Sequence, residues 1–108
     1  MFIRSSNDPG IKDFLHNIIS TYGETAQIDI AIEEMSELTK ALLKKRRYDN
    51  RPHKSSVSNL FRDDVIEEIA DVGIMLEQLI MIFDCETEVK EQIMFKLNRQ
   101  NERMKSGG

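Results

Sequence analysis

Two short acidic segments repeat along the chain with the same order of acidic and apolar residues. Residues 32–38 read IEEMSEL, and residues 66–72, 34 positions further on, read IEEIADV. Each copy holds two carboxylates three positions apart: Glu34 with Glu37, and Glu68 with Asp71. Residues three apart on an α-helix are neighbours, with roughly 5–6 Å between their Cβ atoms. The repeat therefore predicts two helices whose four carboxylates face one another.

Four clustered carboxylates repel one another unless they are protonated or bridged by a cation. A donor set made only of oxygen favours Mg²⁺ or Mn²⁺, and Mg²⁺ usually shares its coordination shell with water and substrate phosphates. Ferritin-like di-iron chemistry is the nearest helical alternative, but it needs Glu-x-x-His pairs. Neither His16 nor His53 has a glutamate three residues before it. The pattern thus favours metal-assisted phosphate chemistry, although a single copy would be more typical of a solvated helix surface.

Helix start and stop signals divide the chain into four helices. Asn7 or Asp8 before Pro9 predicts the start of the first helix, which Gly23 closes. The second helix is expected from about Thr25 to Arg47. Ser56 or Ser58 is expected to cap the third helix, which ends near Phe83. Asp84 or Thr87 is expected to start the fourth helix. We interpret residues 48–57 as a flexible basic loop and residues 105–108 as a frayed tail.

Helical periodicity assigns an apolar stripe to each acidic helix. The stripe of the second helix comprises Ile28, Ala31, Ile32, Met35, Leu38, Thr39 and Leu42, and that of the third comprises Val65, Ile66, Ile69, Val72, Leu76 and Ile80. Further apolar residues fall outside both stripes: Ile30, Met75, Met81 and Ile82. A small bundle cannot easily cover them, so we expect a homodimer or homotetramer. Gly73 inside the third helix suggests a close helix approach or clearance for a ligand.

Length and composition bound the class of protein. The 108 residues fit one all-α domain, residues 1–108, folded as a four-helix bundle-like unit. Fifteen bases against nineteen acids give a net charge of −4, which argues against generic nucleic-acid binding. One cysteine, Cys85, allows no intramolecular disulfide and no zinc cluster. The sequence has no apolar run long enough for a signal peptide or a membrane span, so we expect a cytoplasmic protein.

Three bases follow one edge of the predicted fourth helix: Lys96, Arg99 and Arg103. Their spacing would suit a substrate polyphosphate. The alternative is that they stay solvated or pair with surface acids such as Glu102.

The two acidic motifs, Glu33-Glu34-x-x-Glu37 and Glu68-x-x-Asp71, resemble the signature of the all-α nucleoside triphosphate pyrophosphatases. These are the MazG-like proteins and their relatives, which include phosphoribosyl-ATP pyrophosphatase, and the resemblance covers nearly the whole chain. It implies an oligomeric four-helix enzyme that uses Mg²⁺ to hydrolyse a nucleoside triphosphate to monophosphate and pyrophosphate.

Matched residue by residue, the resemblance implies metal ligands at Glu34, Glu37, Glu68 and Asp71. It makes Glu33 an outer-sphere or water-orienting residue, so that all five acids belong to the catalytic site. The alternative function is a non-catalytic helical module that binds a nucleotide or a protein partner.

Overall fold

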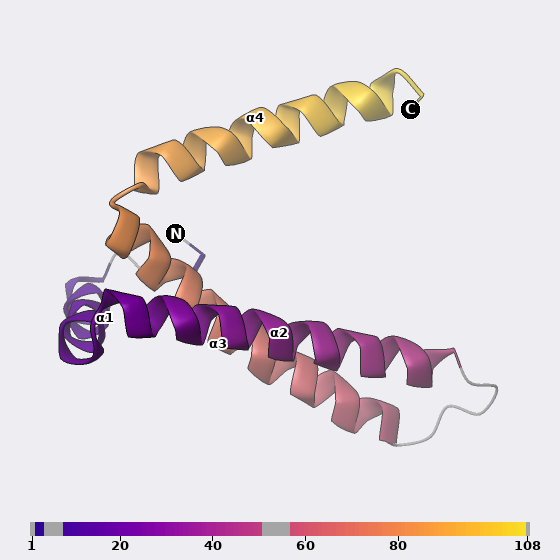
Figure 1. The fold of residues 1–108 in the computed structure, drawn as a ribbon. Coiled ribbons are helices and arrows are strands. Elements are labelled where there is room, and N and C mark those ends of the chain that lie inside the picture. The colour runs from indigo at the N-terminus through magenta and orange to yellow at the C-terminus, as the bar shows by residue number, and fades with distance from the viewer. Residues whose placement is uncertain (1, 4–7, 51–56, 108) are drawn as a thin grey trace.

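The computed structural model describes residues 2–3, 8–50 and 57–107, and the side chains of all of these except 57–60. In this part of the chain there are four helices and no strands, which confirms the all-α prediction. The helices are α1 (Pro9–Tyr22), α2 (Glu24–Asp49), α3 (Val57–Phe83) and α4 (Glu86–Lys105). Helices α2 and α3 lie side by side and antiparallel, and α1 packs at one end of this pair (Figure 1). Of the other three described helices, α4 contacts α3 alone, and it extends away from the pair.

The ends of α1 follow the sequence signals. The side chain of Asp8 accepts a hydrogen bond of 2.8 Å from the Gly10 N–H, and Pro9 is the first helical residue. Gly23 has a φ of 92°, a left-handed value that a residue with a Cβ rarely adopts, and its N–H donates to the Ile19 carbonyl at 2.8 Å. The predicted boundaries of the first helix are therefore confirmed.

Helix α2 runs further than predicted because its last turn packs on α3. The rings of Tyr48 and Phe61 have centroids 4.3 Å apart, and Lys45 pairs with Asp49 at 2.5 Å. Tyr48 and Asp49, assigned to the loop from the sequence, are thus helical. Asn50 is the C-cap of α2, and Val57, the last residue of the predicted loop, is the first of α3. The remainder, from 51 to 56 and including Ser56, lies outside the described residues.

Two other predicted boundaries are corrected. Helix α3 begins at Val57, so Ser58 lies inside it and is not its cap. The N-cap of α4 is Cys85, in place of Asp84 or Thr87. Asp84 instead makes the tight connection, with a left-handed φ of 48°, a conformation that aspartate tolerates better than most residues. At the other end, α4 includes Lys105, the first residue of the predicted tail.

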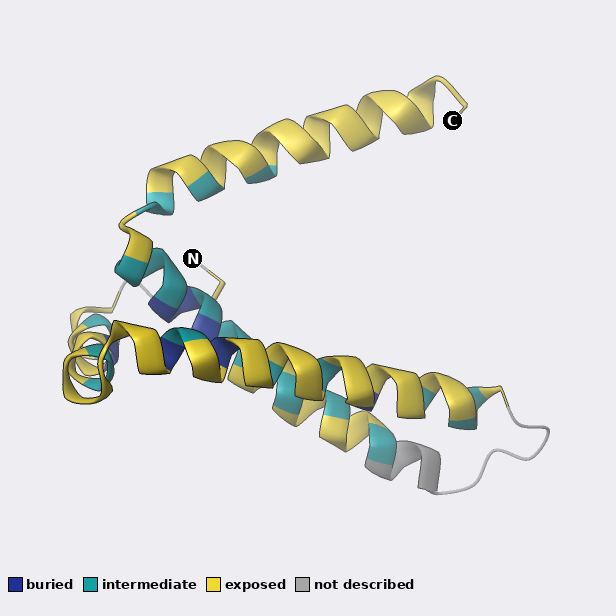
Figure 2. Cartoon of the chain, in the orientation of Figure 1, coloured by how far each residue is buried: buried dark blue, intermediate teal, exposed yellow. Residues whose placement is uncertain are grey.

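The α2–α3 contact follows residues spaced alternately three and four apart, as in a coiled coil. We call these residues the seam. On α2 they are Gln27, Ala31, Glu34, Leu38, Ala41, Lys45 and Tyr48, and on α3 they are Phe61, Val65, Glu68, Val72, Met75, Leu79 and Ile82. All fourteen are buried or half-buried, whereas most other α2 residues are exposed (Figure 2). The seam therefore contains one glutamate from each acidic motif.

The predicted apolar stripes are only partly correct, because each helix packs through the seam. Ile32, Met35 and Leu42 on α2 are 60%, 38% and 45% exposed, and Ile66 and Ile69 on α3 are 48% and 56% exposed. The small seam residues Ala31 and Ala41 are buried instead, since small side chains let two helices approach closely. Met75, expected to be spare apolar surface, is a buried seam residue.

The start of the described chain is anchored on α3. Glu77 is buried, and its Oε1 accepts hydrogen bonds from the backbone N–H groups of Phe2 and Ile3, the latter at 3.2 Å. Burial by itself would raise the pKa of Glu77, but its hydrogen bonds, those from Phe2 and Ile3 among them, outweigh burial and hold the pKa below its usual value. None of the helices in the described ranges is long and apolar enough to cross a membrane.

The anchor gives a pH-dependent stability. A carboxyl whose pKa is lower in the folded state stabilises the fold fully at any pH above its unfolded pKa, which is about 4.3. This stabilisation is lost as the pH falls through the pKa of the folded state. We expect Glu77→Gln to lower the free energy of unfolding at pH 7 by about 1.5–3 kcal/mol and to flatten its decline below pH 4. Glu91→Gln, an exposed change on α4, is the control. Equal stability of wild type and Glu77→Gln at pH 7 would contradict the anchor.

Candidate metal centre

Three carboxylates converge near the middle of the α2–α3 pair. Glu34 comes from the α2 seam, Glu68 from the α3 seam, and Asp71 lies three residues beyond Glu68 on the same helix. One carboxylate oxygen from each residue lies within 4.8 Å of those of the other two. The convergence follows directly from the seam, because the two glutamates occupy contact positions of an antiparallel helix pair. We call these three residues the acidic triad.

The triad is partly withdrawn from water. Glu34 and Glu68 are half-buried, and Asp71 is exposed. The Oε2 atom of Glu68 is buried and has no hydrogen-bond partner among the residues that the structure describes. A buried, unpaired carboxylate oxygen destabilises a fold unless a proton or a cation compensates it. The oxygen-only donor set and this orphaned atom both fit a hard divalent cation.

The electrostatics of the triad disfavour three negative charges. Burial, followed by the charges of Asp71 and Glu68, raises the pKa of Glu34. Hydrogen bonds with the same two carboxyl groups act in the same direction. Because the folded pKa is raised, the contribution of Glu34 to stability is lost as the pH rises through that value. A bound cation would remove this loss at neutral pH.

The fourth predicted ligand, Glu37, lies beside the triad but is not drawn into it. Its carboxylate is about half exposed and pairs with the Nζ of Lys40 at 3.5 Å. A polar pocket of about 110 Å³ joins it to the triad, lined by Glu37, Lys40, Ala41, Lys44, Asp64 and Glu68. Glu33 is exposed on α2 and is not part of the triad. The roles of Glu37 and Glu33 in the site stay predictions.

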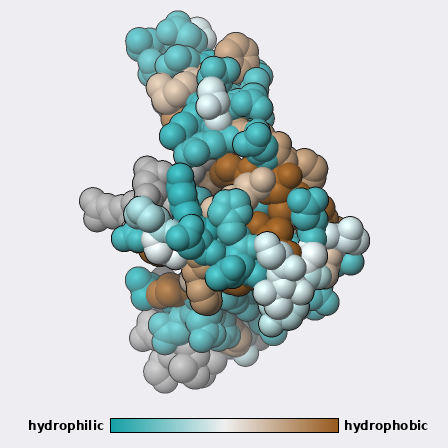
Figure 3. Space-filling model, turned by 90° about the vertical axis from the view of Figure 1, so that its left-hand side faces the viewer, coloured by the Kyte–Doolittle hydropathy of each residue, from teal (hydrophilic) through white to brown (hydrophobic). Residues whose placement is uncertain are grey.

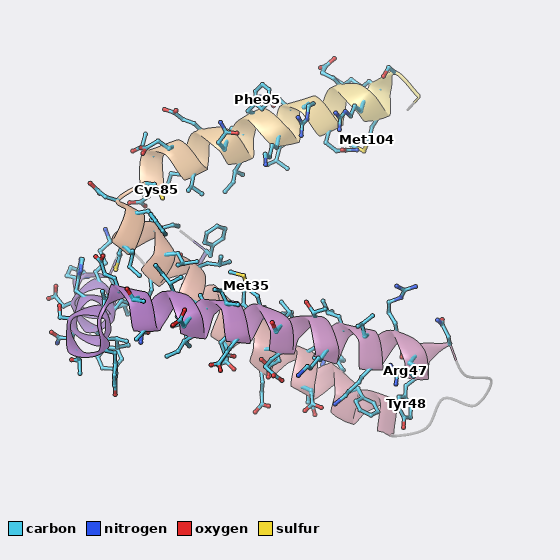
Figure 4. The ribbon with its side chains drawn as sticks, in the orientation of Figure 1. Met35, Arg47, Tyr48, Cys85, Phe95 and Met104 are labelled. Carbon is cyan, nitrogen blue, oxygen red and sulfur yellow. The ribbon has the colours of Figure 1, made fainter. Side chains whose placement is uncertain are left out.

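The three bases predicted to hold phosphate lie on α4, away from α2, and their role stays a prediction. Lys96, Arg99 and Arg103 are exposed on α4, and Figure 4 shows α4 well separated from α2. Met35 lies on the side of α2 that faces α4. Glu37 is two residues further on, about 200° around the helix, so its pocket faces away from α4.

Sequence reasoning missed the residues that complete the polar pocket. Lys40, Lys44 and Asp64 were not among the predicted site residues. The spacing of these residues from the predicted ligands could have indicated them. Lys40 and Lys44 follow Glu37 by three and seven positions, and Asp64 precedes Glu68 by four, so each shares a helix face with a predicted ligand.

Comparison of the chain with protein-family models, with curated proteins and with solved structures found no match in any of the three. The assignment of this site therefore depends on its own geometry and chemistry.

Mg²⁺ is expected to stabilise the folded protein through the triad. A ligand present at a hundredfold excess over its Kd adds about 2.7 kcal/mol to the free energy of unfolding, a rise in melting temperature on the order of 10 °C for a domain of this size. Thermal melts in EDTA and in excess Mg²⁺, at matched ionic strength, measure the effect.

Two neighbouring glutamates supply the matched comparison. Glu68→Gln removes charge from the triad, so it should melt higher than wild type in EDTA and gain little from Mg²⁺. Glu67→Gln changes an exposed residue outside the triad and should keep the full Mg²⁺ response. An equal Mg²⁺ response in both variants would exclude a metal shared by the triad.

Proposed function

We propose that this protein is a Mg²⁺-dependent nucleotide pyrophosphohydrolase that cleaves a nucleoside triphosphate to a monophosphate and pyrophosphate, in house-cleaning or control of the nucleotide pool. The observation that carries the proposal is the acidic triad, which collects carboxylates from both copies of the repeated motif and, within the described ranges, leaves one buried oxygen without a hydrogen-bond partner. The resemblance of the two motifs to MazG-like enzymes supports the same activity.

Glu34, Glu68 and Asp71 would hold Mg²⁺, or Mn²⁺ as a substitute. Rotation of the exposed Glu37 side chain away from Lys40 would add a fourth carboxylate. When bound, the metal ion would neutralise phosphate oxygens and lower the pKa of a coordinated water. In the proposed reaction a water would attack the α-phosphorus, the α–β phosphoanhydride bond would break, and pyrophosphate would leave.

The polar pocket would supply the base for the attacking water and the positive charges for the phosphates. Glu37, which lines the pocket with Glu68, or Glu33, which precedes Glu34 in the sequence, would accept the proton of the attacking water. Lys40 and Lys44 lie on the same face of α2 and would balance the charge of the substrate's phosphates. The chain itself thus provides acids for the metal and bases for the phosphate chain within a few helical turns.

A screen of standard and noncanonical nucleoside triphosphates, with detection of pyrophosphate, tests the activity. We expect Mg²⁺-dependent release of pyrophosphate, reduced at least about a hundredfold in Asp71→Asn, since loss of one group that stabilises the transition state typically costs this much. Asp63→Asn, an exposed aspartate on α3 outside the triad, should retain wild-type activity. Saturable nucleotide binding without any pyrophosphate release would favour the non-catalytic module instead.

Enzyme kinetics can show which bases contact the phosphates: Lys44 in the polar pocket, or Lys96 and Arg103 on α4. Lys44→Ala should raise KM or lower kcat by roughly tenfold, the effect of losing about 1.4 kcal/mol, because its side chain lines the pocket beside Glu37. Lys96→Ala and Arg103→Ala should have smaller effects, and none of the three should change the Mg²⁺-dependent melting shift. A larger loss in the α4 variants than in Lys44→Ala would assign the phosphate contacts to α4.

A further inference from the structure

Lys40 holds the one predicted metal ligand that lies beside the triad and outside it. Its Nζ is 3.5 Å from the Oε1 of Glu37, and the two side chains are 66% and 52% exposed. An exposed ion pair of this kind changes an equilibrium constant by a factor of at most about five. Glu37 can therefore leave Lys40 for a stronger partner at little cost in free energy.

A cation in the acidic triad is such a partner. Glu37 and Glu68 line the same polar pocket, which has a volume of about 110 Å³. The Oε2 of Glu68, buried and without a hydrogen-bond partner in the described part of the chain, belongs to the same centre. A divalent cation attracts a carboxylate more strongly than an ammonium does, because it carries twice the charge and binds the oxygen directly. Once a metal ion is bound, the Glu37 carboxylate is therefore drawn from Lys40 toward the triad.

The other side of the helix pair is apolar. A groove of about 360 Å³ runs along that side, and Figure 3 shows hydrophobic surface exposed beneath α4. The residues that line this apolar groove include Phe2, Ile3, Leu38, Ile69, Val72 and Leu76. Gly73 lines it too, and a Cβ built there would meet no described atom within 4 Å, so the close helix approach expected from the sequence does not occur within one chain. Of the described residues that line the groove, none carries a charge, so the partners of Glu37 lie in the polar pocket.

The release of Glu37 leaves the Lys40 ammonium without its carboxylate. Lys40 lines the polar pocket together with Lys44 and Glu68, so its charge stays beside the triad. Mg²⁺ usually shares its coordination shell with substrate phosphates, and an ammonium binds phosphate oxygens through its charge. A phosphate on the metal would therefore replace Glu37 as the partner of Lys40.

We propose that Lys40 is a positioning residue that exchanges partners: it holds Glu37 outside the metal centre while no metal is bound, and it pairs with a substrate phosphate once Glu37 has joined the metal. The proposal rests on the pyrophosphohydrolase assignment, which supplies both the metal and the phosphate. Because one ammonium serves the carboxylate and the phosphate in turn, metal and phosphate each strengthen the binding of the other. The protein then binds a triphosphate tightly only when the cation that assists its cleavage is in place.

Calorimetric titration of the full chain with MgCl₂, at fixed ionic strength, tests the first half of the exchange. Lys40→Met removes the ammonium and keeps a good helix former, so it should tighten Mg²⁺ binding by about two- to fivefold. Adding Lys40→Met to Glu37→Gln should change nothing, since no carboxylate is left to release, and Lys40→Arg should match wild type. The control is Lys44→Met: Lys44 lines the same pocket but lies seven residues beyond Glu37, about 10 Å along the helix axis, so the Mg²⁺ affinity should stay at the wild-type value.

Binding of inorganic pyrophosphate tests the second half. In excess Mg²⁺, Lys40→Met should bind pyrophosphate about two- to fivefold more weakly than wild type. In EDTA the two proteins should bind it equally, because Glu37 then occupies Lys40. Lys44→Met should weaken binding in both conditions, since the charge of Lys44 does not depend on Glu37. Chelation of Mg²⁺ by pyrophosphate in solution is the same for every protein and cancels in the comparison.

Three results would overturn the exchange: equal Mg²⁺ affinity in wild type and Lys40→Met, the same tightening with and without Glu37, or a loss of pyrophosphate binding that does not depend on Mg²⁺. Each of them leaves the pyrophosphohydrolase assignment standing if wild type binds Mg²⁺ and releases pyrophosphate from a triphosphate. A wild type that binds no Mg²⁺ would overturn both proposals. The side chain of Lys40 is exposed, so its variants keep the fold, which circular dichroism verifies.

Discussion

The placement of Glu34 and Glu68 at contact positions of the α2–α3 seam is the constraint on which the rest of the structure depends. Two helices that pack through alternating three- and four-residue spacing normally place apolar side chains at these positions. Here each helix contributes a glutamate, and Asp71 adds a third carboxylate from the next turn. Like charges held in contact oppose folding. The fold can retain this arrangement because apolar seam residues, Leu38 and Val72 among them, continue the contact beyond the acids.

This arrangement also separates the two sides of the helix pair. On one side, the polar pocket places Lys40 and Lys44 next to acids of both helices. On the other side lie the apolar groove and the exposed Met35. The seam contributes to both, because Glu68 lines the pocket while Leu38 and Val72 line the groove. One helix pair can therefore support a charged site and an apolar face without mixing them.

Much of the secondary structure and the candidate triad could be predicted from local patterns. The Asp8–Pro9 start and the Gly23 stop depend on backbone geometry within a few residues, and the repeated acidic motif is visible without any tertiary information. Glu34, Glu68 and Asp71 were predicted to meet, and they do. The packed face of each helix was harder to predict because α2 and α3 carry apolar residues on two sides. Periodicity locates the apolar residues, but it does not tell which of them pack within the chain.

The lack of a local signal for tertiary contacts also explains the remaining differences between the predicted and the observed structure. Ile32 and Ile69 belong to the strongest periodic stripes, yet the chain leaves them exposed and buries Ala31 and Gln27 instead. The extension of α2 to Asp49 comes from the Tyr48–Phe61 contact, which joins residues on two helices and has no local signal. The direction of α4 depends on the turn at Asp84 and Cys85, where a single left-handed residue sets the path of twenty that follow.

The position of α4 has a consequence for how the chain acquires its structure. Helices α1 to α3 contact one another and precede α4 in the sequence, so they have their packing partners as soon as they have been synthesised. Helix α4 emerges later and finds little to pack against within its own chain. The apolar face of α4 therefore stays exposed after the other three helices have packed. An exposed apolar helix is the state that proteases and aggregation act upon, so a newly made chain stays open to both at its last helix.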